Sequence, residues 1–137
     1  MKLKKEIEIF EISNIYFSNV TFFQLFETIS DFNFKKIFIL FPDPWPKKKH
    51  KKRRLINEEF VKHINQITYK NSEIYIATDD EDYANQISKS FLKQNFFKLL
   101  LKTTDNQSFQ NHNIYPTKYY RKAKRENRRI NFFIYKK

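Results

Sequence analysis

Residues 36–46 read K-I-F-I-L-F-P-D-P-W-P, an apolar run that three prolines bring to an end. An uninterrupted apolar run of this length predicts a β-strand buried on both faces of a parallel sheet. Proline cannot donate to a sheet ladder, so the strand is expected to end where the prolines begin. The prolines therefore leave one acidic residue, Asp43, in a stiff frame directly after the strand and beside Trp45, the only tryptophan of the chain.

The same pattern returns farther along the chain. Residues 72–78 read S-E-I-Y-I-A-T, which predicts a second buried strand, and Asp79 follows it directly. Helices are predicted over 22–29, over 57–69 with Asn57 as N-cap, and from Asp79 or Asp80 through Leu92. The remaining expectations are a helix over 2–12, short strands over 14–18, 96–102 and 131–135, and a polar, basic loop between the last two strands.

This alternation of strands and helices predicts an α/β fold with a mainly parallel sheet, built as one domain over residues 1–137. In such sheets, ligands bind at the carboxyl ends of the strands. Asp43 and Asp79 both follow predicted strands, so both are candidates for a binding site there. For Asp79 an alternative stays open, because an aspartate in this position also caps the helix that follows.

The chain has 27 Lys and Arg against 15 Asp and Glu, a net charge of +12. Such an excess favours a polyanionic partner, with nucleic acid the commonest one. The alternative is a codon bias that enriches lysine without a function. The absence of cysteine excludes disulfides and thiol metal sites, and His50 has no partner at metal-ligand spacing. With no signal peptide and no apolar run long enough to span a membrane, the sequence predicts a soluble, cytoplasmic protein without a metal.

The positive charge is densest directly after the proline frame. Residues 47–54 read K-K-K-H-K-K-R-R, in which only His50 is neither lysine nor arginine. Such a run indicates salt-dependent contacts with phosphates, although a solvated charged surface has the same composition. A second basic segment, 118–129, interleaves tyrosines with cations, and both an RNA surface and a helix with a charged outer face explain it.

Three motifs together resemble the bacterial tRNA (guanine-N7-)-methyltransferases. The stretch F-P-D-P-W-P-K-K-K-H-K-K-R-R-L at 41–55 is similar to the signature of that family. A-T-D-D-E-D-Y-A at 77–84 resembles its A-T-D-x-x-x-Y-A segment. P-T-K-Y-Y-R-K-A at 116–123 resembles its R-P-x-T-K/R-F/Y-E-x-R/K segment, and N-F-F-I-Y-K its last strand. The first motif is highly specific, and the resemblance covers the chain from about Asn14 onward.

The resemblance implies a Rossmann-like fold, S-adenosylmethionine as cofactor, and methylation of a guanosine in the variable loop of tRNA. It makes Asp43 the active-site acid, which also faces the cofactor. It places substrate contacts at Lys47, Asp79, Thr117, Lys118 and Tyr120. It places RNA contacts at Lys49, His50, Lys51, Lys52, Arg53 and Arg54.

The chain also departs from the family pattern. The family holds its cofactor with a Gly-rich turn, and this chain contains no glycine. Asn19 stands at the position of a cofactor-binding acid, where its amide oxygen can accept from an adenine amino group. Tyr120 stands where the family has a glutamate. We therefore expect the C-terminal, substrate-side portion of the fold without its first strands. Three explanations are a fragment with those strands encoded upstream, a truncation completed by a partner chain, and a decaying gene product.

Two further functions compete with this interpretation. One is a basic RNA-binding remnant without catalysis, which explains the charge and the missing turn. The other is an amino-methylating enzyme acting on nucleic acid, because D-P-W loosely resembles the D/N-P-P-Y/F/W motif of that class. The single proline between Asp43 and Trp45 and the basic run that follows disfavour the second.

Overall fold

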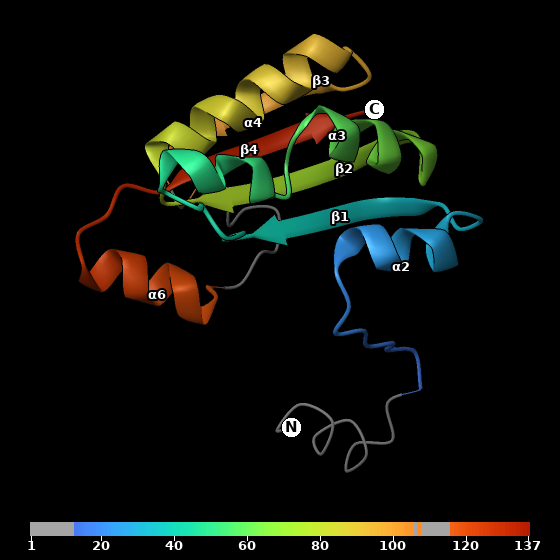
Figure 1. Cartoon of the computed structure of the whole chain (residues 1–137), viewed down its shortest axis with the longest axis horizontal. Helices are drawn as coiled ribbons and strands as arrows, with labels where there is room; N and C mark the ends of the chain where they lie inside the picture. The colour runs from blue at the N-terminus through green and yellow to red at the C-terminus, as the bar shows by residue number, and fades with distance from the viewer. Residues whose placement is uncertain (1–12, 106, 108–115) are drawn as a thin grey trace.

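The computed structural model describes residues 13–105, 107 and 116–137. It contains α2 (Phe22–Ile29), β1 (Phe34–Leu40), the 3₁₀-helix η1 (Lys48–Arg53), α3 (Glu58–Gln66), β2 (Thr68–Thr78), α4 (Glu81–Gln94), β3 (Lys98–Thr103), α6 (Lys118–Arg125) and β4 (Asn131–Lys136). Helices lie on both sides of a single twisted sheet, which confirms the α/β class (Figure 1). The helix expected over 2–12 lies outside the described residues. None of the described helices is long and apolar enough to cross a membrane.

The four strands of the described residues follow the order β1-β2-β4-β3. Among them only β1 and β2 pair in parallel, whereas β4 is antiparallel to both of its neighbours. The prediction of a mainly parallel sheet is therefore wrong for the strand pairing, because the sheet is mixed. Because β4 alone is reversed, β1, β2 and β3 still point the same way. A pattern of apolar residues predicts where strands lie but not which strands become neighbours.

The two strands that were predicted to be buried differ in their burial. β2 is buried from Ile74 to Thr78, as its sequence predicts. β1 was expected to be buried on both faces, and this is wrong, since only Ile39 of this strand is fully buried and Phe38 is 48% exposed. The reason is position, because β1 is an edge strand of the described sheet and has a neighbouring strand on one side only.

Two hydrophobic clusters hold the layers together. The first packs α3 and α4 on one face of the sheet, with Phe60, Ile64, Ile87 and Phe91 against strand residues such as Ile76. The second joins α6, through Ala123, to Tyr75, Ala77, Phe132 and Ile134 on the opposite face. Alternate residues of β2 thus enter opposite clusters, which is the two-residue period of a strand. Burial of this apolar surface is the main force that keeps α6 on the sheet.

Most local predictions agree with the elements observed. Asn57 caps α3 by accepting from the Phe60 N–H over 2.9 Å, and Asp80 caps α4 by accepting from the Tyr83 N–H over 2.7 Å. The strand expected over 14–18 is absent, since residues 13–20 form no regular element. The region expected as a loop before β4 contains α6, which begins at a capping threonine, Thr117.

Candidate functional site

The candidate site lies where the strands end at one edge of the sheet. Leu40 pairs with Ala77, so the residues that follow β1 and β2 leave the sheet side by side. Thr78 pairs with Asn131, which brings the segment before β4 to the same edge. Figure 1 shows the arrowheads of β1 and β2, η1 and α6 together on one side of the molecule. The prediction that Asp43 and Asp79 follow neighbouring strands is therefore confirmed.

The proline frame after β1 has an unusual backbone. Phe41 continues the ladder by donating its N–H to Ala77 O over 2.8 Å, yet its φ is +55°. Trp45 has a φ of +42°. Bulky residues disfavour positive φ, and such conformations cost roughly 1–3 kcal/mol each unless their surroundings fix them. The loop that carries Asp43 is thus held in a shape that the chain would not adopt alone.

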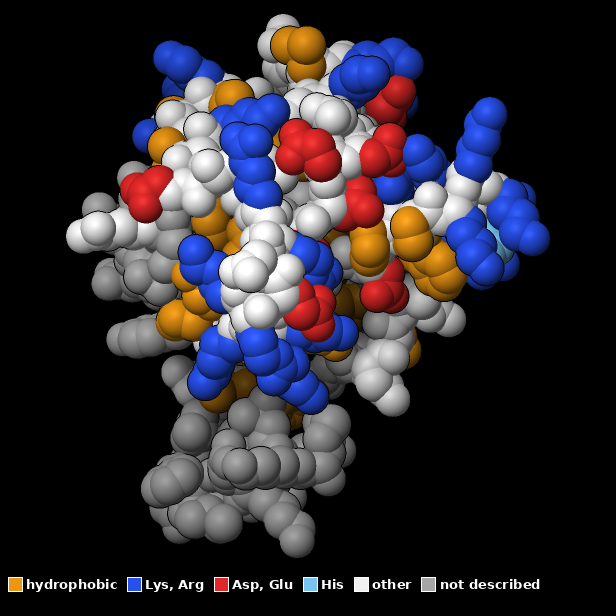
Figure 2. All heavy atoms as spheres, turned by 90° about the vertical axis from the view of Figure 1, so that its left-hand side faces the viewer, with side chains coloured by type: hydrophobic (Ala, Val, Ile, Leu, Met, Phe, Trp, Pro, Cys, Tyr) orange, Lys and Arg blue, Asp and Glu red, His pale blue; other side chains and the backbone are white. Residues whose placement is uncertain are grey.

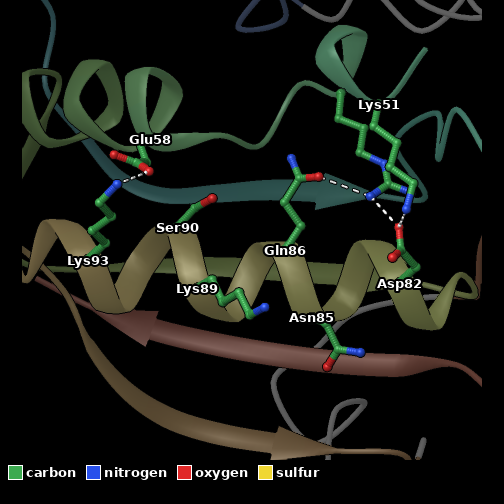
Figure 3. Close-up of a pocket in the computed structure, with 9 residues that line it drawn as sticks. Lys51, Glu58, Asp82, Asn85, Gln86, Lys89, Ser90 and Lys93 are labelled. Atoms are coloured by element: carbon green, nitrogen blue, oxygen red, sulfur yellow. Dashed lines mark hydrogen bonds and ion pairs between the residues drawn. The ribbon is translucent and has the colours of Figure 1, made fainter. Parts of the chain in front are cut away.

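Arg54 supplies part of that support. Its side chain is only 1% exposed, and its Nε donates to the main-chain oxygen of Pro44 over 2.6 Å. Its Nη1 contacts Gln86 Oε1 at 3.0 Å and Asp82 Oδ2 at 2.7 Å, while Nη2 lies 3.6 Å from Asp80 Oδ1. Gln86 and Asp82 point from α4 toward the segment that carries Lys51 (Figure 3). The predicted RNA contact at Arg54 does not suit this buried position, because the side chain is occupied inside the protein.

The rest of the basic run forms η1, which the sequence did not predict. Lys49, Lys52 and Arg53 are exposed, as is Lys47 just before the helix. Lys51 is partly engaged, since its Nζ lies 2.7 Å from Asp82 Oδ2. Hydrogen bonds from Lys51, and then from Arg54, hold the pKa of Asp82 below its usual range. Winding the run into a helix directs several cations to solvent while Arg54 turns inward.

Trp45 is covered by two neighbours from η1. The guanidinium of Arg53 lies 5.0 Å from the Trp45 ring centroid, and His50 meets the ring edge-on at 5.8 Å. These contacts fasten η1 to the proline frame and leave the tryptophan half-buried. The frame and the basic helix therefore form one unit, tied at Trp45 and at Arg54.

The two acidic residues at the strand ends have different surroundings. Asp43 is exposed, and none of the described residues forms an ion pair with it. Asp79 has a side chain that is 14% exposed and pairs with Nη1 of Arg128, whose Nη2 lies 2.9 Å from Glu126. Because Asp80 is the helix cap, the alternative that Asp79 merely caps α4 is wrong. Arg128 is a neighbour that sequence reasoning missed among many similar cations.

The α6 segment reaches the same edge. Tyr119 stacks on Phe41, with ring centroids 6.4 Å apart and planes inclined by 25°. The hydroxyl of Thr117 accepts from the Tyr120 N–H over 3.1 Å, so it acts as the helix cap. Tyr120 packs half-buried against the second cluster, and Lys118 is exposed. The structure thus brings the 117–120 segment near the proline frame, about 75 residues earlier in the sequence.

Asn19, the other predicted cofactor contact, is exposed in the irregular segment before α2. No described hydrogen bond joins it to Asp43. Within the described ranges, no group of three or more His, Cys, Asp or Glu side chains could hold a metal ion. Of the two carboxylates predicted for this edge, Asp43 faces solvent and Asp79 is paired with Arg128. Figure 2 shows blue side chains gathered on this face with red ones between them.

Comparison with known proteins shows that this chain is similar to several methyltransferases. A family model described as "Putative methyltransferase" matches residues 1–133. A tRNA (guanine-N(7)-)-methyltransferase of Wolbachia pipientis wMel is 38% identical over 132 residues, which cover 96% of this chain and 57% of that protein. The protein of the same name from Leptospira interrogans (strain Fiocruz L1-130) is 32% identical, over 95% of this chain and 58% of its own length. A bifunctional methyltransferase of Rickettsia felis is 34% identical over 85% of this chain and 23% of its own length. The chain spans little more than half the length of the first two relatives.

Proposed function

The chain belongs to this methyltransferase family, and we propose that it forms the tRNA-binding and guanosine-binding side of an enzyme that makes N7-methylguanosine in tRNA. One observation carries the proposal. The exposed carboxylate of Asp43 lies in a fixed loop, at the sheet edge where β2 also ends, directly before the cations of η1. The 31–39% identity to several proteins named tRNA (guanine-N(7)-)-methyltransferase supports the same substrate.

The chemistry of this reaction suits an acidic residue that orients the base. Guanine N7 has a free lone pair, so its methylation needs no base to remove a proton. The protein has to hold the purine, align N7 and stabilise the positive charge that develops on the ring. A carboxylate can accept from guanine N1–H and the exocyclic amine, or face the developing charge. We assign this role to Asp43, with Asp79, Thr117, Lys118 and Tyr120 as further contacts of the base and its ribose.

The cations of η1 have a separate role in this proposal. Lys47, Lys49, Lys52 and Arg53 are exposed on the segment that follows Asp43. Lysine and arginine contacts with phosphates supply affinity that is salt-dependent and largely independent of sequence. His50 and Lys51, which are half-buried, contribute at the inner side of the same surface. Arg54 is assigned to holding the loop rather than to the RNA.

S-adenosylmethionine, the cofactor of this family, supplies a methyl group on a positively charged sulfur when bound. Asn19 and Asp43 are the two side chains predicted for it, and both are exposed to solvent. The chain has no glycine, so none of its turns offers the unhindered backbone that approaches a cofactor closely. These residues alone therefore do not enclose the cofactor, and this chain's own contribution lies on the substrate side.

A second candidate is RNA binding without methyl transfer. Tyr120, in place of the glutamate of the family motif, and the absence of glycine favour it. The two functions predict different contents of N7-methylguanosine in the tRNA of the natural host after the gene is deleted. Deleting the gene and quantifying nucleosides by mass spectrometry should remove N7-methylguanosine from the tRNA if the methyltransferase proposal is right. An unchanged content of that nucleoside would contradict it and leave the binding function.

A further inference from the structure

A cleft of about 340 Å³ opens beside α6. Its walls include Tyr120 and Lys124 from α6, and Arg128 and Arg129 from the segment that leads into β4. Strand pairing places it at the edge already described, because Asn131 pairs with Thr78. Arg128 connects the cleft with the candidate site directly, since it lines the cleft and pairs with Asp79.

The cations of this cleft are not all compensated. Arg128 is held between two carboxylates, those of Asp79 and Glu126. Lys124 and Arg129 are exposed, and no ion pair joins either to another described residue. The groove along α4 differs in degree, because its Lys51 and Lys93 each lie 2.7 Å from a carboxylate oxygen, while its Lys89 forms no ion pair with a described residue. The cleft beside α6 thus holds two uncompensated cations and the α4 groove one, and uncompensated cations in a concave site attract an anion.

Apolar side chains contribute little of the cleft's surface, because Ile130 and Phe132, which line it, are only 4% and 2% exposed. Thr104 also lines the cleft and adds a hydroxyl. Tyr120 stands half-buried at one wall, where its ring packs with the second cluster. A bare phosphate ion would contact only the cations of the cleft. A nucleotide can also use the half-buried ring of Tyr120, because its phosphate pairs with the cations while its base or ribose lies against the aromatic ring.

We propose that this cleft binds one phosphorylated nucleotide of the RNA, next in the strand to the guanosine held near Asp43. The inference rests on the proposed RNA substrate and adds a specific second contact to it. Blue side chains gather in several groups on this face, with red and orange ones between them (Figure 2). An RNA strand that crosses the edge can thus contact η1 on one side and the cleft on the other.

The test uses the whole chain and an unmodified tRNA transcript. Lys124→Ala combined with Arg129→Ala removes two cations from the cleft. Lys62→Ala combined with Lys70→Ala removes two exposed lysines elsewhere, so both variants lose the same net charge. We expect the cleft variant to bind tRNA about 10-fold more weakly, and its slope of log affinity against log salt to fall by about 1.4–1.8. The control variant should stay within about twofold of the unsubstituted chain.

A second measurement locates the ligand and does not depend on the variants. In NMR titrations of the unsubstituted chain, guanosine monophosphate should shift the amide signals of Thr104 and Ile130, whereas guanosine or inorganic phosphate alone should shift them much less. Equal losses of affinity in the two double variants, or shifts only outside the cleft, would overturn the inference. Failure of the unsubstituted chain to bind tRNA would instead contradict the proposed function.

Discussion

The Nε atom of Arg54 lies 2.6 Å from the main-chain oxygen of Pro44, next to the carboxylate-bearing residue Asp43. Ten residues separate the two partners along the chain, and the intervening segment holds Trp45 and η1. The same guanidinium contacts Gln86 and Asp82 on α4. One buried side chain thus ties the proline frame to the helix that follows β2, which fixes the two strand ends relative to each other.

Replacing Arg54 with lysine should destabilise the fold. Lysine keeps the charge but lacks the planar fork that reaches Pro44, Gln86 and Asp82 together. We expect a loss of about 2–3 kcal/mol in the free energy of unfolding, measured by urea denaturation, because buried partners lose their hydrogen bonds. Arg53→Lys, at the exposed neighbouring position, is the control and should cost less than about 1 kcal/mol. Equal losses of stability in the two variants would contradict the role of Arg54 in holding the proline frame.

The ion pairs of Asp82 should make part of the stability depend on acid pH. The folded protein holds the pKa of Asp82 below its usual range through Lys51 first and Arg54 second. A lowered pKa in the folded state gives stability that is present above the ordinary carboxyl pKa, about 4, and is lost as the pH falls through the folded value. Asp82→Asn should therefore lose less stability than the unsubstituted chain when urea midpoints are compared above and below about pH 4. Parallel losses would contradict this role.

Tyr83 should give a second pH dependence, at the alkaline end. Burial raises its pKa to about 12, and its Oη accepts from the Ile56 N–H over 2.8 Å. A raised pKa means that the associated stability is complete below the unfolded value, about pH 10, and is lost as the pH rises toward the folded value. Tyr83→Phe should start about 1–3 kcal/mol less stable, because the buried Ile56 amide loses its partner.

The loss of folding stability at alkaline pH that is due to Tyr83 is the difference between the losses of the unsubstituted chain and of Tyr83→Phe. From about pH 9 to pH 11.5, Tyr83→Phe should lose about 2 kcal/mol less than the unsubstituted chain. Tyr16→Phe is the control, since Tyr16 is 93% exposed and should change neither value. An absorbance titration of tyrosinate that shows Tyr83 ionising with the exposed tyrosines would sink this explanation.

The chain by itself should bind S-adenosylmethionine weakly. Asn19 and Asp43 are exposed, and no glycine allows a close turn of the backbone around the cofactor. Isothermal titration calorimetry of residues 1–137 should show no binding in the micromolar range. A micromolar dissociation constant would contradict this prediction and would mean that other residues of the chain build a cofactor site.

Much of the fold follows from local sequence signals. The cap at Asn57, the helical face of α3 and the buried run of β2 were predicted because each depends on residues close together in the chain. The 14–18 strand failed for the complementary reason. A few apolar residues can form a strand only beside a partner, and the described residues provide none there.

The candidate site was predicted in part. The strand-end positions of Asp43 and Asp79 were found from the sequence, because a strand and the residue after it are adjacent in the chain. Arg54 was grouped with its neighbours, since one arginine in a basic run has no local mark that it will be buried. Its partner Gln86 lies 32 residues away, and only the packing of α4 brings the two together. Arg128 was not predicted for the same reason, because its pairing with Asp79 depends on the antiparallel placement of β4.

The most direct test of the account is the content of N7-methylguanosine in tRNA after Asp43→Asn is introduced at the native gene. Asparagine keeps the shape of the side chain and removes its charge. Asp31→Asn is the control, because Asp31 is exposed before β1, at the opposite end of that strand. We predict that the modified nucleoside falls by about 100-fold or more with Asp43→Asn and is unchanged with Asp31→Asn, while the tRNA affinity of the purified chain stays within about twofold. An unchanged content of N7-methylguanosine in the Asp43→Asn strain would contradict the central claim.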